Sequence, residues 1–133
     1  MGKGPLVDGR EVVELGNYFK CSFVEGEFTF TSVEQYFQFH KSEMISYRVC
    51  ILACTTPLGC WRLGRSVVLR DDWESLKVGV MERANRLKFT QNKNLCDILR
   101  MTSPHPLVFC EHTPRDFWDM ENQRILEELR FKM

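Results

Sequence analysis

The sequence predicts a single α+β domain in which helices dominate and strands are few. Its 133 residues, 44% of them hydrophobic and 27% charged, suit one compact domain with a buried core. Apolar residues recur at spacings of three and four over several stretches, whereas strand-like runs are short. Neither a repeat nor a linker divides the chain. We therefore expect one domain over residues 11–133, preceded by a flexible leader, residues 1–10, with three glycines and a proline.

Strands are expected at both ends of the chain. Val12, Val13 and Leu15 indicate a short strand, and two aromatic-rich runs, residues 22–24 and 28–30, flank a Glu-Gly-Glu turn that is typical of a β-hairpin. Near the carboxyl end, four apolar residues, 107–110, predict a buried strand. That strand would deliver Glu111, His112 and Thr113 to its end, and the next residues, 116–118, would lie in a loop.

Helix signals occupy most of the remaining chain. Thr56-Pro57 places a cap residue before a proline, which predicts a helix that ends at Gly64. Apolar residues from Trp73 to Leu87 recur at helical spacing behind a cap at Asp71 or Asp72. The other expected helices cover residues 31–41 with a continuation from 43 to 54, residues 95–101, and the region of residues 125–130.

Residues 31–41 carry charges on an unexpected face. At about 100° per residue, Glu34 and Lys41 fall in the same arc as Val33, Tyr36 and Phe37. A soluble helix normally keeps its charges away from the core, because an unpaired buried charge costs several kcal/mol. Such a conflict is typical of a functional site.

Two interpretations of Glu34 remain open from the residues alone. Thr31-x-x-Glu34 and Ser32-x-x-Gln35 both fit the capping box, so Glu34 would satisfy backbone amides in the first turn. Alternatively, Glu34 is a carboxylate that faces a ligand. The two roles are compatible with each other.

Charge and cysteine usage exclude several classes of protein. Eighteen basic and 18 acidic side chains leave no net field to attract a nucleic-acid backbone. The six cysteines include no C-x-x-C pair, which favours reduced thiols in an intracellular protein and gives no support for a metal site. No apolar run approaches the roughly 20 residues that a membrane span needs. We expect a cytoplasmic protein without a cofactor.

Three acids and several cationic and aromatic residues are candidates for chemistry. Glu34, Glu111 and Asp116 lie at expected element boundaries; two converging carboxyl groups are what hydrolysis of a glycosidic bond requires. Phosphate-binding candidates are Lys41, Arg65 and Lys88, and base-stacking candidates are Phe19, Trp73 and Trp118. Each also has a structural interpretation, as a helix-end charge or a core aromatic. No G-x-S-x-G, G-x-G-x-x-G or Walker pattern is present.

Beside these candidates, a series of short motifs resembles the NADAR (YbiA-like) family in the family's order. Residues 15–19 (LGNYF) resemble its L-S-N-F-Y element, and Ser32, Glu34, Gln35, Tyr36, Gln38 and Lys41 match S-x-E-[HQ]-Y-x-Q-x-x-K. Further matches are residues 63–65 (L-G-R), 70–73 (R-x-x-W), 88–92 (K-F-x-Q-N), 111–113 (E-x-[ST]) and 116–118, which resembles D-x-x-W with one residue fewer.

The resemblance implies the family's helix-dominated fold with a small β-hairpin and an N-glycosidase activity. Members of the family act on ribosylamino-pyrimidine phosphates of riboflavin synthesis or on guanine-linked ADP-ribose, including guanine in nucleic acid. Carried over by motif, Glu34 becomes the leading catalytic carboxylate, and Asp116 with Trp118 the second catalytic element. The implied substrate-binding residues are Asn17, Phe19, Lys41, Arg65, Trp73 and Lys88. The resemblance implies neither a metal nor an organic cofactor.

The sequence departs from the family after Trp118. The family continues with W-G-x-G, a variable loop and G-x-N-x-L-G, whereas this chain continues directly with DMENQRI, in which only Asn122 matches. Glycines in such a loop let the backbone approach a ligand closely. Their loss favours an alternative hypothesis, a binding module that keeps the ADP-ribose or ribose-phosphate pocket without turnover.

Overall fold

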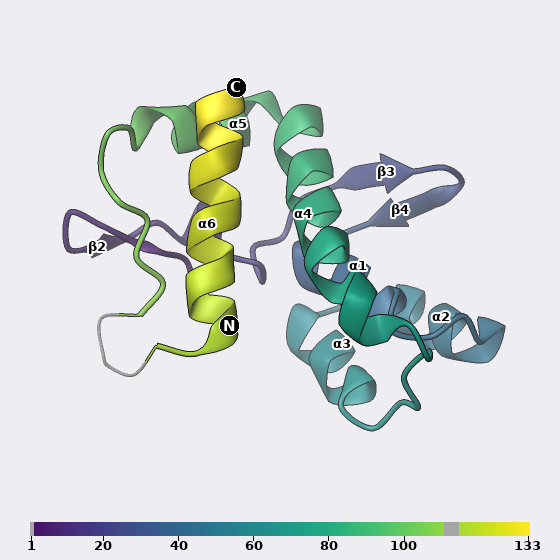
Figure 1. Cartoon of the computed structure of the whole chain (residues 1–133). Helices are drawn as coiled ribbons and strands as arrows, with labels where there is room; N and C mark the ends of the chain where they lie inside the picture. Colours follow the sequence, from purple (N-terminus) through teal and green to yellow (C-terminus); the bar gives the residue numbers. More distant parts are fainter. Residues whose placement is uncertain (1, 111–114) are drawn as a thin grey trace.

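The computed structural model describes residues 2–110 and 115–133 and confirms a helix-dominated α+β architecture (Figure 1). Two small antiparallel sheets accompany the helices. The first pairs β1 (Leu6–Val7) with β2 (Arg10–Glu11), and the second pairs β3 (Phe23–Glu25) with β4 (Phe28–Phe30). The helices of the described residues are α1 (Val33–Phe39), α2 (Ile45–Ala53), α3 (Pro57–Gly64), α4 (Trp73–Gln91), α5 (Lys93–Met101) and α6 (Phe117–Lys132).

The amino-terminal segment has more structure than expected. Residues 6–11 form the β1–β2 hairpin, which crosses the predicted leader boundary, and the Leu6 amide donates to the carbonyl of Val108. Gly4 and Pro5 are buried. The predicted strand over residues 12–15 is wrong: Val13–Leu15 is a 3₁₀ turn, η1, that buries Leu15.

The predicted β-hairpin, the helix caps and the breaks are largely confirmed. The Thr56 hydroxyl accepts from the Gly59 amide at the start of α3, with Pro57 at the first helical position. Asp72 precedes α4, and Asn92 separates α4 from α5. Between α1 and α2 the chain leaves helical geometry, because the Lys41 carbonyl accepts from the Arg70 amide instead of a helical partner.

The predicted strand over residues 107–110 is also wrong. Leu107 is fully buried, but its amide donates to the carboxylate of Glu127. The β-pairing of this segment is therefore limited to one isolated bridge between Val108 and Leu6. The expected loop at residues 116–118 is instead the start of α6, with Asp116 at its N-cap. Glu111, His112 and Thr113 lie outside the described residues.

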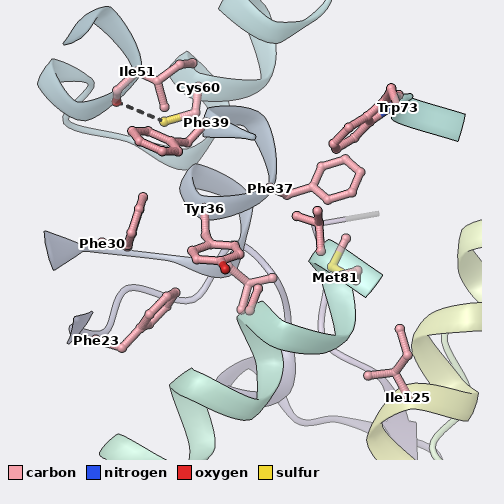
Figure 2. Packing of buried hydrophobic residues seen from close by; sticks show 13 residues of the cluster. Phe23, Phe30, Tyr36, Phe37, Phe39, Ile51, Cys60, Trp73, Met81 and Ile125 are labelled. Atoms are coloured by element: carbon pink, nitrogen blue, oxygen red, sulfur yellow. Dashed lines mark hydrogen bonds between the residues drawn. The ribbon is translucent and has the colours of Figure 1, made fainter. Parts of the chain in front are cut away.

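Two apolar clusters place α1 and α4 at the centre of the domain. Figure 2 shows the first cluster, in which aromatic side chains of α1 pack against the β3–β4 hairpin on one side and α4 on the other. Tyr36 lies edge-on to Phe30, and Phe37 lies edge-on to Trp73. The second cluster joins η1, α4, α5 and α6 through Leu15, Phe89, Leu95, Leu99, Leu107 and Leu126.

Within residues 2–110 and 115–133, no helix has the length and apolar character that crossing a membrane requires.

Candidate functional site

Glu34 lies in the first turn of α1 and is fully buried. Its backbone amide donates to the Asn17 carbonyl at 3.0 Å, which fixes the helix start against the segment after η1. Only one of its carboxyl oxygens, Oε1, has a hydrogen-bond donor among the described residues; Oε2 is buried without one. Burial raises the pKa of Glu34, opposed by the Gln38 hydrogen bond and by the charge of Lys41.

The structure separates the two interpretations of Glu34. The capping role belongs to Ser32 and Gln35: the Ser32 hydroxyl accepts from the Gln35 amide at 3.0 Å, and the Gln35 side chain accepts from the Thr31 amide at 2.8 Å. The Glu34 side chain bonds no backbone amide of this turn. Its carboxyl group is therefore not explained by helix capping, and the interpretation as a ligand-facing carboxylate remains.

Gln38 contacts Glu34 one helical turn later. Its Nε2 donates to Glu34 Oε1 at 2.7 Å, while its Oε1 is buried without a partner among the described residues. Gly64, the last residue of α3, packs directly against this amide: a Cβ at Gly64 would lie 1.8 Å from Gln38 Oε1. On the other side, Tyr47 of α2 donates to the backbone carbonyl of Gln38 at 2.7 Å.

Asn17 adds a third buried polar group beside Glu34. Its Nδ2 has no acceptor among the described residues, although the residue is buried. Among the described residues, these three thus include one buried donor without an acceptor, Asn17 Nδ2, and two buried acceptors without a donor, Glu34 Oε2 and Gln38 Oε1. Buried polar groups are normally hydrogen-bonded, so three unsatisfied ones in residues linked by direct bonds indicate a place for a polar ligand.

Lys41 and Arg65, two of the predicted phosphate-binding residues, lie around Gly64 at the end of α3. Lys41 Nζ lies 3.4 Å from the Gly64 carbonyl and 5.7 Å from the Phe37 ring centre. Burial lowers its pKa, while Glu34 raises it. Arg65 is exposed, with its guanidinium 4.7 Å from the Trp61 ring centre. Only Lys41 is brought close to Glu34.

Lys88 is held inside the protein. It is fully buried on α4, and its Nζ donates to the Gly16 carbonyl at 2.9 Å. Burial lowers its pKa to about 8. The ammonium also lies 5.7 Å from the ring centre of Phe19, which lines an open hollow of about 550 Å³ together with Tyr18 and the amino-terminal residues 2–4.

The rest of the K-F-T-Q-N motif also contacts the amino-terminal half. Gln91 accepts from the Val24 amide at 2.7 Å and donates to the Val24 carbonyl at 2.8 Å. It thereby takes the place of a neighbouring strand along β3. Asn92 donates to the Ser22 carbonyl at 2.9 Å. This motif therefore fixes residues 16–24 against α4.

Two of the three predicted aromatic residues contact Phe37, whereas Phe19 lies beside Lys88. Trp73, at the start of α4, and Trp118, in the first turn of α6, both lie edge-on to the Phe37 ring, at 5.1 Å and 5.2 Å between ring centres. Trp73 is buried, whereas Trp118 is partly exposed. The late segment of the chain therefore reaches the helix that carries Glu34.

Asp116 has an identified structural role. Its Oδ1 accepts from the Asp119 amide at 2.7 Å, and Asp119 Oδ2 accepts from the Asp116 amide at 3.1 Å. This reciprocal pair is a capping box at the start of α6. Asp116 is exposed, and nothing in the described residues brings its carboxyl group to Glu34.

Two residues of the site were absent from the predicted set. Gln38 belongs to the same motif as Glu34, and the helical i, i+4 spacing was a signal for their contact. Gly64 was interpreted as a helix stop and as part of the L-G-R motif, without a role at the site. Its second role, the close approach to Gln38, depends on how α3 packs on α1. In the described part of the chain, no cluster of three or more His, Cys, Asp or Glu residues has the arrangement of a metal site.

The fold and the site together define a helix-dominated α+β domain. At the start of its central helix lies a buried carboxyl group, of which one oxygen has a hydrogen-bond donor among the described residues and the other has none. The family model of the NADAR domain matches residues 9–128. The chain therefore belongs to the NADAR domain family.

Similar proteins agree with this assignment. The chain is 41% identical over 98 residues to N-glycosidase YbiA of Escherichia coli, which covers 71% of this chain and 59% of that protein. It is 34% identical over 104 residues to the chloroplastic riboflavin biosynthesis protein PYRR of Zea mays, covering 68% of this chain and 16% of that protein. The NMR structure of E. coli YbiA superposes with a TM-score of 0.78 at 33% identity, covering 90% of this chain and 76% of that one. The chain thus spans about three-fifths of the length of the curated YbiA sequence that it matches.

Proposed function

We propose that this chain is an N-glycosidase that hydrolyses the N-glycosidic bond of a ribose-phosphate nucleoside. The observation that carries the proposal is Glu34: a fully buried carboxyl group with one oxygen that has no hydrogen-bond partner among the described residues. The similarity to a protein named N-glycosidase YbiA and to a riboflavin biosynthesis protein supports the reaction class.

The chemistry follows from the state of Glu34. Because burial raises its pKa, its carboxyl group keeps its proton to higher pH than an exposed glutamate does. A protonated Oε2 can donate this proton to the nitrogen of the leaving base as the C1′–N bond breaks with its electron pair. Water then adds to the oxocarbenium carbon and gives a proton back to the Glu34 carboxylate, so the products are a free base and a ribose-phosphate.

The neighbouring groups suit a ribose-phosphate. Asn17 Nδ2 and Gln38 Oε1 offer one donor and one acceptor, which match sugar hydroxyl groups. The Lys41 ammonium is a cation beside Glu34 and would bind phosphate. We further propose that Phe19, Trp73 and Trp118 provide aromatic surface for the base, and that Arg65 and Lys88 contribute to the phosphate side. Asp116 as a second catalytic carboxylate stays a prediction.

The test uses both substrate classes, ADP-ribosylated guanine and a ribosylamino-pyrimidine phosphate. Purified protein should release free base or ADP-ribose from one of them, and Glu34→Gln should reduce this release to background. Glu74→Gln is the matched control, because Glu74 also lies in the first turn of a helix but is exposed. The proposal is contradicted if the protein hydrolyses neither substrate, or if Glu34→Gln hydrolyses a substrate as fast as the unchanged protein does.

One observation favours a second candidate function, a non-catalytic module that binds ADP-ribose or ribose-phosphate. Residues after Trp118 continue in α6 without the glycine-containing loop that the family resemblance leads one to expect. Calorimetric titration with ADP-ribose distinguishes the two functions. Binding without turnover of either substrate supports the module, whereas turnover excludes it.

A further inference from the structure

The polar contacts around Glu34 are unequal. Its only side-chain hydrogen bond in the described part of the chain comes from Gln38 Nε2, at 2.7 Å. A carboxyl group on a side chain with several rotatable bonds needs such a bond to hold one orientation, particularly in a buried site where water does not compete. Gln38 is buried as well, so its own amide must be held by the protein.

Two helices hold Gln38 in place. Gly64 of α3 leaves space only for the amide: a Cβ there would lie 1.8 Å from Gln38 Oε1 and 2.6 Å from Gln38 Cδ. Tyr47 of α2 binds the backbone carbonyl of Gln38. The Gly64 carbonyl also lies 3.4 Å from the Lys41 ammonium, the cation whose charge acts on Glu34. Gly64 therefore contacts both Gln38, on α1, and Lys41, which follows the end of α1.

We propose that Gln38 is the positioning residue of Glu34 and that Gly64 sets the place of its amide, so that Glu34 Oε2 points at the scissile bond. Gln38 acts through Glu34, by directing Oε1 toward its own Nε2 and leaving Oε2 free for the leaving base. This inference rests on the proposed N-glycosidase function for its kinetic consequence. Its structural part concerns the unliganded protein alone.

The bond from Gln38 also affects the proton on Glu34. An amide donor stabilises the ionised carboxylate, so its removal should raise the pKa of Glu34 above the value in the unchanged protein. Among the titratable side chains of the described residues, Lys41 lowers the pKa of Glu34, and the charge of Glu34 in turn raises the pKa values of Tyr18, Tyr47 and Cys60. None of them donates a hydrogen bond to its carboxyl group.

Three variants test the positioning role. Gln38→Ala removes the donor, and Gly64→Ala displaces it while Gln38 remains. Gly79→Ala is the matched control, since a Cβ at Gly79 would meet nothing within 4 Å. In the double variant Gln38→Ala/Gly64→Ala, the new methyl group at position 64 has no Gln38 amide to displace. The pKa change of Glu34 in the double variant should therefore equal that in Gln38→Ala alone.

The first measurement needs no substrate. Carbon-13 NMR titration of the Glu34 carboxyl group in the full chain should show a raised pKa in Gln38→Ala and in Gly64→Ala, and an unchanged pKa in Gly79→Ala. A Glu34 pKa that is the same in all variants overturns the inference, and so does an additive effect in the double variant. Thermal unfolding of each variant shows that the chain is folded during the titration.

The second measurement is the pH profile of kcat on the active substrate. A hydrogen bond that orients the protonated acid should be worth about 10-fold in kcat with little change in KM. The alkaline limb of the profile should move to higher pH with the Glu34 pKa. A pKa change without any turnover in the unchanged protein contradicts the proposed function and leaves the contact between Gln38 and Glu34 established. Turnover that Gln38→Ala leaves unchanged contradicts the positioning role alone.

Discussion

Replacing Lys88 with methionine should change how the stability of this protein depends on pH. Lys88 is fully buried on α4, where its ammonium donates to the Gly16 carbonyl. Burial lowers its pKa from 10.5 to about 8, and the neighbouring Cys21 and Glu14 act in the opposite direction. The folded protein therefore releases this proton at a lower pH than the unfolded chain does.

The sign and the size follow from proton linkage. Between about pH 8 and 10.5 the unfolded state binds more protons at Lys88 than the folded state, so the free energy of unfolding rises with pH. With these two pKa values the contribution of Lys88 between about pH 7.5 and pH 9.5 is about 2 kcal/mol. Methionine has a similar length and no proton to release. The Lys88→Met variant should therefore lack this rise.

Urea unfolding of both proteins at several pH values between about 7 and 9.5 measures the effect, as the difference in unfolding free energy between them. This difference should move by about 2 kcal/mol in favour of the lysine protein as pH rises. Lys93→Met is a suitable control, because Lys93 is exposed and pairs with Asp97 on the surface. A difference between Lys88→Met and the unchanged protein that stays constant with pH would refute the reasoning.

Three further predictions concern the site and its supports. Glu34→Gln should raise the free energy of unfolding at pH values where Glu34 is ionised, since a neutral amide avoids the burial of a charge; the gain should vanish as pH falls below the usual glutamate pKa, measured by urea unfolding. Gln91→Ala should cost about 1 to 2 kcal/mol and speed hydrogen exchange at the Val24 amide, because two hydrogen bonds to β3 are lost; unchanged exchange there contradicts this role. Asp116→Ala should cost about 1 kcal/mol and Asp116→Asn almost nothing, because asparagine also caps a helix; loss of turnover in Asp116→Asn with unchanged stability would establish Asp116 as the second catalytic carboxylate.

Local signals in the sequence predicted the elements that local contacts determine. Thr56-Pro57 started α3, and the apolar spacing from Trp73 predicted α4, because caps and amphipathic stripes act within one helix. The capping box of Asp116 with Asp119 was a local signal too, and it would have corrected the expected loop at residues 116–118.

The errors arose where a distant contact decides the backbone. Residues 107–110 have the composition of a buried strand, but the Leu107 amide is bound by Glu127, twenty residues later. The helix of residues 31–41 was expected to continue, but Arg70 binds the Lys41 carbonyl and interrupts it. The approach of Gly64 to Gln38 likewise depends on the packing of α3 on α1. Periodicity and turn propensity carry no information about such pairs.

Glu34 and Lys88 show how two buried charges in one domain differ in their roles. The Lys88 ammonium donates to the Gly16 carbonyl at 2.9 Å and lies near the rings of Phe19 and Phe89. These contacts stabilise the buried charge and hold residues 16–19 against α4. Glu34 has a donor on one oxygen and none on the other among the described residues, whereas the neighbouring cap residue Gln35 has partners on both its amide oxygen and its amide nitrogen. Burying a carboxylate with only one hydrogen bond costs more free energy of folding than that bond returns, so stability alone does not explain this arrangement. A ligand would supply the missing partner of this oxygen, so the hydrogen-bond partners of a buried charge, rather than burial itself, mark Glu34 as the candidate catalytic group.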